Sequence, residues 1–292
     1  MKTAGPSFLL GVFLALVWMP SAEAQTLSSF TATYSGGSGT ICGTTYSIRG
    51  REPAASGRYP VFVYTVGTTE QYDHSSALAA VEEMAARGYV AATVEYDNGS
   101  FGSCSTLNSR SRCIYDAGRS SSAISRLCSR AKADCSKGVV VSGFSQGSIM
   151  AILAKNHDSR VRAAYGLGAG VQYSIYNLSS CVADGNRALP SDRLRIVNGE
   201  QDAFVGPTAS GVRSQSTEMT GLSCPLAMSC FRSNNSGWYI IDDSQVADGT
   251  ADHCYMRNSG CIGLTLDSTW RSGTAPWSLR TNLNWLTQFT TP

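Results

Sequence analysis

The sequence predicts an α/β fold in which helices cover both faces of a mostly parallel sheet. Three observations support this prediction. Short apolar runs alternate with helical segments along most of the chain. Its 292 residues, 42% of them hydrophobic, suffice for one large core. No internal repeat or long low-complexity linker divides the chain, so residues 25–292 are expected to form a single domain.

The N-terminal half of the predicted sheet begins with a strand pair and then a buried strand. The run at 59–66 is apolar and ends at Gly67, and the helix at 75–87 has Ala and Leu at helical spacing with Gly88 just past its end. The expected elements up to the sheet centre are strands at 30–34, 44–48 and 59–66, a helix at 75–87, a strand at 89–96, and a helix near 117–130.

The second half repeats the same alternation, which is typical of parallel strands joined by helices. Its expected elements are a strand at 139–141, a helix from 146 to about 156, strands at 161–167, 194–197 and 238–241, and a closing helix at 279–289.

The first 24 residues predict a secretory signal peptide. An apolar stretch at 8–18 follows Lys2, and Ala22-Glu23-Ala24 is a small-residue cleavage site. The apolar stretch is shorter than the roughly 20 residues of a membrane span. We therefore expect cleavage before Gln25 and a secreted product, extracellular or periplasmic, without a stable membrane anchor.

The ten cysteines all follow the predicted cleavage site and indicate disulfides in an oxidising compartment. Apart from the adjacent His253-Cys254, the chain lacks closely spaced Cys or Cys/His ligand pairs, so no metal is expected. Sequence spacing leaves the connectivity open. Pairing neighbours in sequence gives Cys104–Cys113, Cys128–Cys135, Cys224–Cys230 and Cys254–Cys261, with Cys42–Cys181 as a long-range pair.

The pentapeptide Gly143-Phe144-Ser145-Gln146-Gly147 lies between a predicted strand and a predicted helix. This is the context of a nucleophile elbow, a sharp turn that exposes a strained serine above the sheet edge. The flanking glycines, Gly143 and Gly147, are expected where side chains would collide. With this motif the chain resembles the α/β-hydrolase superfamily, and the Gln after the serine resembles the G-Y-S-Q-G of cutinases.

The resemblance implies a catalytic triad built on Ser145, because a serine hydroxyl needs an imidazole base and a carboxylate that orients it. The superfamily order is serine, acid, histidine, and of the three histidines only His253 follows the serine at a suitable distance. His157 falls near the end of the serine's own helix. His74 precedes the serine and remains a candidate for lining the site.

Asp202 is the expected acid, because it follows the predicted strand at 194–197. Glu200 in the same loop is an alternative. The remaining alternatives also lie between the serine and the histidine, and they are Asp242, Asp243, Asp248 and Asp252.

The resemblance also implies an oxyanion hole formed by the backbone N–H groups of Gln146 and Thr68, with Thr69 as an alternative to Thr68. This chain departs from the family there, since Val66-Gly67 stands where α/β-hydrolases often carry His-Gly. The expected acyl pocket is apolar, and its candidate lining residues are Tyr72, Phe204 and Trp238.

The function expected from these residues is that of a secreted, monomeric serine hydrolase that cleaves a small or polymeric carboxylic ester through an acyl-enzyme, without a cofactor. Cutinases are shorter chains in which the acid and the histidine are close in sequence, so the acyl and alcohol groups stay open. A serine peptidase and a non-catalytic binding protein are the alternatives. A formal net charge of +2 without a basic stripe gives no support to nucleic-acid binding.

Overall fold

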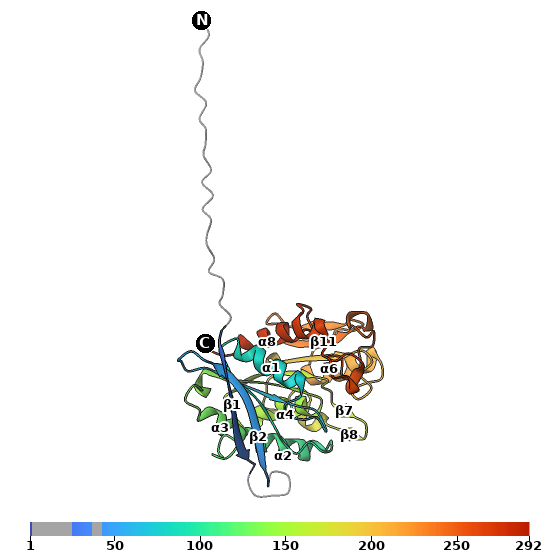
Figure 1. Ribbon diagram of the computed structural model, residues 1–292. Coiled ribbons are helices and arrows are strands. Elements are labelled where there is room, and N and C mark those ends of the chain that lie inside the picture. Colours follow the sequence, from blue (N-terminus) through green and yellow to red (C-terminus); the bar gives the residue numbers. More distant parts are fainter. Residues whose placement is uncertain (2–24, 37–42, 292) are drawn as a thin grey trace.

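The computed structural model describes residues 1, 25–36 and 43–291. The predicted signal peptide beyond Met1 and the cysteine at position 42 lie outside the described residues. A mixed sheet forms the centre of the described chain (Figure 1), with strand order β1-β2-β4-β3-β5-β6-β9-β11-β10. In chain order its strands are β1 (Leu27–Ser35), β2 (Thr45–Pro53), β3 (Val61–Thr65), β4 (Val90–Val94), β5 (Val139–Phe144), β6 (Val161–Leu167), β9 (Leu194–Gly199), β10 (Ser229–Phe231) and β11 (Gly237–Ile241).

The strand directions confirm the α/β-hydrolase fold class. Strands β4, β3, β5, β6, β9 and β11 run parallel, whereas β2 is antiparallel to both of its neighbours. The central strands are rich in Val and Ala and buried on both faces, as parallel strands covered by helices require. The strands β1 and β2, blue in Figure 1, lie at one edge of the sheet, and β11 and β10 lie at the other.

Helices pack on both faces of this sheet. Helix α1 covers β3 and β4, and α8 covers β6 and contacts both α1 and α7, whereas α4 lies against β5 and β6 beside α2 and α5, and α6 covers β9 and β11. Within the described part of the chain, no helix is long and apolar enough to cross a membrane. The helices are α1 (Ser75–Ala85), α2 (Cys104–Tyr115), α3 (Ala123–Cys128), α4 (Gln146–Leu153), α5 (Ser179–Val182), α6 (Ala209–Thr220), α7 (Ser268–Ser272) and α8 (Leu279–Thr287).

Short elements complete the connections between strands and helices. The hairpin of β7 (Gln172–Tyr173) and β8 (Tyr176–Asn177) follows β6. Single 3-10 turns are η1 (Cys135–Lys137), η2 (Ala154–Asn156), η3 (Ser191–Arg193), η4 (Asp243–Gln245) and η5 (Gly260–Ile262).

The expected helix near 117–130 is wrong in extent, since α3 begins only at Ala123 and a separate helix, α2, precedes it. The sequence of α2 is rich in Ser, Asn and Arg, which are weak signals of an amphipathic helix. Its stability comes from tertiary packing, because Leu107 and Ile114 are fully buried and the helix lies against α4. Helix α6 also escaped prediction; it begins with a Thr208 cap and ends at Gly221 in the left-handed conformation.

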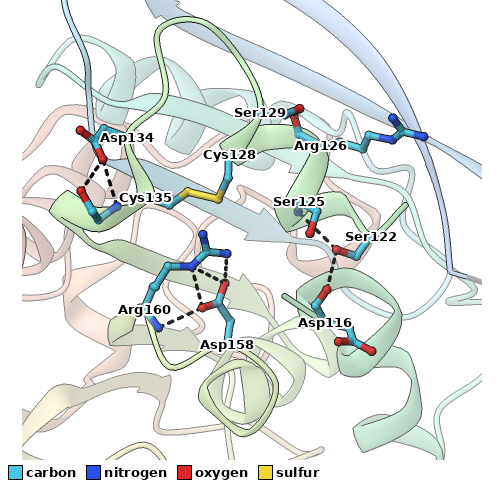
Figure 2. Close-up of a disulfide and its surroundings, with 11 residues drawn as sticks. Asp116, Ser122, Ser125, Arg126, Cys128, Ser129, Asp134, Cys135, Asp158 and Arg160 are labelled. Carbon is cyan, nitrogen blue, oxygen red and sulfur yellow. Dashed lines mark hydrogen bonds and ion pairs between the residues drawn. A yellow bond between two sulfur atoms is a disulfide. The ribbon is translucent and has the colours of Figure 1, made fainter. Parts of the chain in front are cut away.

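Disulfides fasten the loops around the sheet. The expected pairs Cys128–Cys135, Cys224–Cys230 and Cys254–Cys261 are confirmed. Figure 2 shows the first of them joining the end of α3 to the turn that leads into β5. The remaining two expected pairs are wrong, and they are corrected by the bond between Cys104 and Cys181.

The bond between Cys104 and Cys181 ties α2 to α5 with a Cα–Cα distance of 5.9 Å. Cys113 lies near the opposite end of α2, about 13 Å along the helix axis from Cys104. Cα atoms that far apart cannot be bridged by a disulfide. Cys113 is itself disulfide-bonded.

Candidate active site

Ser145 occupies the sharp turn between β5 and α4. Its backbone has φ 53° and ψ −122°, a conformation that costs free energy for any residue with a side chain. Its N–H donates to the carbonyl of Leu167 at 2.8 Å, which ties the turn to the end of β6. The sequence predicted this elbow from the pentapeptide, and the strained backbone agrees with it.

The two glycines beside the serine are required by close backbone contacts. A Cβ atom on Gly143 would lie 2.4 Å from the carbonyl oxygen of Gly147, and one on Gly147 would lie 2.2 Å from that of Thr65. The Thr65 hydroxyl also donates to the Gly147 carbonyl at 2.7 Å. The elbow is therefore packed directly against the end of β3, where no larger residue fits.

Asp202 and His253 are in direct contact. The Nδ1 atom of His253 lies 2.7 Å from Oδ2 of Asp202, and both residues are buried. The other carboxylate oxygen accepts hydrogen bonds from the N–H groups of Phe204 and Val205, at 3.1 and 3.0 Å. The carboxylate is thus held in one orientation. The His253 imidazole is its only side-chain partner in the described chain.

Close glycine contacts bring the histidine loop to the ends of β6 and β9. A Cβ atom on Gly199 would lie 2.0 Å from the Ala251 carbonyl, and one on Gly168 would lie 2.8 Å from Cε1 of His253. The Gln201 N–H also donates to the Ala251 carbonyl at 3.0 Å. These contacts place the imidazole above the carboxyl edge of the sheet, beside the elbow.

Two aromatic rings pack against the imidazole of His253. The ring centroids of Phe144 and Phe204 lie 4.9 and 4.7 Å from it. Its Nε2 atom is buried and has no hydrogen-bond partner among the described residues. Ser145 and His253 line the same cavity, so the structure brings together the serine, the histidine and, through the histidine, Asp202.

The alternative histidines and acids lie elsewhere. His74 caps α1 and accepts from the Ser76 N–H, outside the residues that line this cavity, and His157 bonds Asn108 at 3.2 Å beyond α4. Glu200 accepts from the Asp243 N–H at 2.7 Å. The remaining Asp candidates bind backbone N–H groups of their own loops, with Asp242 to Ser244, Asp243 to Ala251, Asp248 to Ser259 and Asp252 to Cys254.

The N–H groups of Gln146 and Thr68 are free of hydrogen bonds within the described chain, whereas that of Thr69 donates to the Asn98 carbonyl at 2.9 Å. Gln146 is the first residue of α4, so its N–H also lies at the positive end of a helix. Of the two alternatives in the loop after β3, Thr68 therefore has the available N–H. Thr69 has φ 62°, which marks a strained backbone next to the site.

The side chain of Gln146 connects three parts of the site. It is fully buried, and its Nε2 donates to the Thr68 hydroxyl and to the Ser100 carbonyl, both at 2.9 Å. Its Oε1 accepts from the guanidinium of Arg110 at 2.8 Å. Sequence reasoning considered only the backbone of Gln146. The missed partner, Arg110, comes from the unpredicted helix α2.

A buried ion pair joins the loop after β3 to the histidine loop. Glu70 bonds the guanidinium of Arg257 and also accepts from the Gly67 N–H at 2.7 Å. The guanidinium lies 5.6 Å from the ring centroid of Phe144, and burial lowers the pKa of Arg257. Neither residue was a candidate from the sequence, because nothing in a chain marks partners so far apart.

The cavity beside Ser145 and His253 has a volume of about 420 Å³ and aromatic walls. Phe101 packs against Tyr173 and Tyr176, with centroids 4.6 and 5.7 Å apart. Of the three predicted pocket residues, Phe204 lines this cavity. The aromatic lining residues are Phe101, Phe144, Tyr173, Tyr176 and Phe204.

The structure corrects the other two predicted pocket residues. Trp238 is fully buried within β11, and its indole N–H donates to the Leu222 carbonyl at 2.9 Å. Tyr72 lies in the loop between β3 and α1 and lines a neighbouring cavity with Asp73 and Glu95. Strand burial accounts for Trp238, and a hydrogen bond of 2.6 Å from the Thr93 hydroxyl to the Tyr72 carbonyl holds Tyr72 beside β4.

Among the described residues, no group of three or more His, Cys, Asp or Glu side chains could hold a metal ion. Ser145, His253 and Thr68 line the cavity, and the N–H groups of Thr68 and of Gln146, the residue next to Ser145, are free of hydrogen bonds within the described chain.

No model of a known protein family matches the chain, and no curated protein matches it. Many solved structures are similar to it, including the following three. A hypothetical protein from Pseudomonas aeruginosa is 17% identical over 60% of this chain, with a TM-score of 0.37. DcsB, solved with a substrate analogue, is 20% identical over 50% of this chain, with a TM-score of 0.38. This chain spans about half the length of both, 52% and 47%.

The third similar structure is brefeldin A esterase, a bacterial homologue of human hormone-sensitive lipase. It is 16% identical over 68% of this chain and 69% of its own length, with a TM-score of 0.41.

Proposed function

We propose that residues 25–292 form a secreted serine hydrolase that cleaves carboxylic esters, with Ser145 as nucleophile, His253 as base and Asp202 as acid. The observation that carries the proposal is the 2.7 Å contact between His253 and Asp202 at the cavity that also contains the strained Ser145. A buried carboxylate on Nδ1 leaves Nε2 as the atom that can accept a proton.

The proposed reaction has two halves. In the first, Nε2 of His253 takes the Ser145 hydroxyl proton as the oxygen attacks the acyl carbon, and the imidazolium then gives that proton to the departing alcohol. In the second, His253 takes a proton from water, the hydroxide adds to the acyl-enzyme, and the proton returns to Ser145 as the acid leaves. Asp202 stabilises the imidazolium in both halves.

The negative oxygen of each tetrahedral intermediate needs donors that are fixed in advance. The free N–H groups of Gln146 and Thr68 are suited to this role, and the side chain of Gln146 holds the Thr68 hydroxyl at 2.9 Å. The helix dipole of α4 adds positive potential at the same point. We therefore assign the oxyanion hole to these two residues.

An ester is the proposed substrate because the cavity beside the serine is walled by aromatic rings, which favour an apolar acyl group. The dipeptide Ser145-Gln146, which resembles that of cutinases, also favours an ester. The leader at residues 1–24 and the disulfides of the described chain support secretion. No cofactor enters the mechanism, and the substrate is either a small ester or a polymeric one.

Turnover of p-nitrophenyl esters beside the matching p-nitroanilides tests this proposal against a peptidase and a binding protein. We expect ester hydrolysis that Ser145→Ala removes, and anilide hydrolysis that is far slower. Ser174→Gly is the matched control, because Ser174 also lines the cavity and its φ of 51° suits glycine. Ester turnover that survives in Ser145→Ala would contradict the assignment, and preferred anilide cleavage would favour the peptidase.

A further inference from the structure

A second cavity lies at the amino ends of the parallel strands, whereas Ser145 lies at their carboxyl ends. It has a volume of about 560 Å³ and is lined by Arg195 of β9, by Phe231 of β10, by Asn235 of the turn after β10, and by residues of α8 and the segments beside it. Arg195 is near the beginning of β9, whereas Asp202 follows the end of that strand. The two cavities are therefore separated by the length of the strand, roughly 20 Å.

Arg195 is a buried cation without an anionic partner. Its side chain belongs to a residue only 5% exposed, and it forms no ion pair with any described residue. One guanidinium nitrogen donates to the Pro276 carbonyl at 3.1 Å, and Nε is buried with no partner. Burial lowers the pKa of Arg195 to about 10. A buried charge is normally paired, so this one stands in need of an anion.

The groups that face Arg195 are aromatic or neutral. Its guanidinium lies 4.8 Å from the ring centroid of Phe231 and 6.0 Å from that of Trp285. The strand register explains the first contact, since Gly237 pairs with both Arg195 and Phe231 and has no side chain between them. The phenol of Tyr165 faces it from β6, and burial keeps that phenol neutral by raising its pKa. Aromatic faces attract a cation but do not neutralise it.

The wall formed by α8 offers hydrogen-bonding groups that are not consumed by the fold. The side chain of Asn284 is exposed and makes no hydrogen bond within the described chain. Gln288 uses its Nε2 on the Asn234 carbonyl, which leaves its Oε1 free. The hydroxyl of Thr281 also lines the cavity, but it already donates to the Thr274 carbonyl at 3.3 Å and accepts from the Ser278 hydroxyl at 2.9 Å. A guanidinium beside aromatic rings and the free side-chain amide groups of Asn284 and Gln288 is suited to a ligand that has both a carboxylate and hydroxyl groups.

We propose that this cavity, lined by Arg195, Phe231, Thr281, Asn284, Trp285 and Gln288, binds a hydroxylated organic acid of the uronic acid class. The carboxylate pairs with the Arg195 guanidinium, and the hydroxyl groups bond the side chains of α8. The site is separate from Ser145 and does not depend on the proposed esterase function. The carboxylate of the ligand is the anionic partner that Arg195 lacks within the described chain.

D-Galacturonate is the probe, with D-galactose, acetate and sulfate as comparison ligands. Binding to the disulfide-intact mature protein is measured by calorimetry and by the shift of Tm. We expect galacturonate to raise Tm in a concentration-dependent way, acetate to do so more weakly, and galactose to have no effect. An equal response to galactose, or to sulfate, would overturn the proposal, as would the absence of any binding by galacturonate.

Arg195→Met keeps an unbranched apolar stem in the cavity but removes the charge, and it should weaken galacturonate binding at least tenfold. Arg193→Met is the matched control, because Arg193 lies at the same sheet edge but is exposed and 3.8 Å from Asp192. Equal affinity in Arg195→Met and Arg193→Met contradicts the assignment. Ester turnover should be unchanged in both.

If Arg195→Met does not fold, Asn284→Ala at an exposed position of α8 and Gln288→Ala at the exposed C-cap of this helix provide the second test. Each should weaken galacturonate binding severalfold, while leaving acetate binding unaltered because acetate has no hydroxyl groups. Unchanged galacturonate affinity in both variants would place the ligand elsewhere.

Discussion

Nδ1 of His253 lies 2.7 Å from the Asp202 carboxylate, although the two residues stand 51 positions apart in the chain. The loop after β9 carries the acid, and the close approach of Gly199 to the Ala251 carbonyl brings the histidine loop against it. A buried, oriented imidazole at this position is the feature on which the proposed chemistry depends.

Asp202→Asn should lower kcat for ester hydrolysis roughly 10³- to 10⁴-fold, because an amide can hold the imidazole in the wrong tautomer and does not stabilise its charged form. The measurement is steady-state kinetics with a p-nitrophenyl ester. Glu200→Gln is the control, since its side-chain oxygen can still accept from the Asp243 N–H. If Glu200→Gln caused a loss of similar size while Asp202→Asn stayed active, the catalytic carboxylate would be Glu200 and not Asp202.

Gln146→Ala should lower kcat by roughly tenfold or more with a smaller effect on KM, because the loop that carries the Thr68 N–H loses its link to α4. Thr68→Val removes the same contact from the other side, whereas Thr68→Ser keeps the hydroxyl. We expect Thr68→Ser to retain most turnover and the double variant Gln146→Ala/Thr68→Val to lose no more than either single variant. Fully additive losses would argue against a shared role.

The Cys254–Cys261 disulfide begins at the residue after His253, and both cysteines line the cavity. Replacing both by serine should reduce ester turnover roughly tenfold or more while the protein stays folded, because the loop that carries His253 is no longer crosslinked. The control is the same replacement of Cys224 and Cys230, which closes a loop of similar length away from the cavity. Equal turnover in the two double variants, with the bonds verified by mass spectrometry, refutes this role.

Asp252, the residue before His253, makes the stability of the folded protein depend on pH. Burial, with help from the charges of Asp248 and Asp202, raises its pKa in the folded protein despite its bond to the Cys254 N–H. A raised folded pKa means that the folded state binds the proton more tightly, so this residue's contribution to stability falls as pH rises from the unfolded pKa, near 4, to the folded one. Above that window the penalty is constant.

Asp252→Asn should therefore raise Tm relative to the wild type at pH 7, and the difference should disappear at about pH 3, where both side chains are neutral. The amide oxygen can still accept from the Cys254 N–H. Calorimetric melting of both proteins at the two pH values is the measurement. A difference that is the same at both values would mean that the charge of Asp252 has no part in it.

The elements that sequence reasoning could predict are those with a local signal. Val139–Val141 followed by the pentapeptide indicated the elbow, because apolar runs and paired glycines are visible in a short window. Helix α2 gave no such signal, since its stability comes from packing against α4 and from the bond between Cys104 and Cys181. That same bond explains why the expected pair Cys104–Cys113 was wrong, although the other three pairs of neighbours in sequence were correct.

The residues of the candidate site were likewise predictable only where the sequence carries a local signal. Order along the chain singled out Asp202 and His253, but long-range contacts had no signature. The ion pair of Glu70 with Arg257 joins residues 187 positions apart, and Arg110 meets Gln146 only after α2 has docked. Trp238 was wrong as a pocket residue because an aromatic residue in a strand can face the core as easily as a cavity.

The central claim is that Ser145 forms a covalent bond with an electrophilic acyl or phosphonyl group. The most direct measurement is mass spectrometry of peptides from the protein after treatment with a fluorophosphonate, with Ser174→Gly treated in parallel. We expect a single stoichiometric adduct on Ser145 in both proteins and none after denaturation before treatment. An adduct on another residue, or none on the folded protein, would contradict this claim.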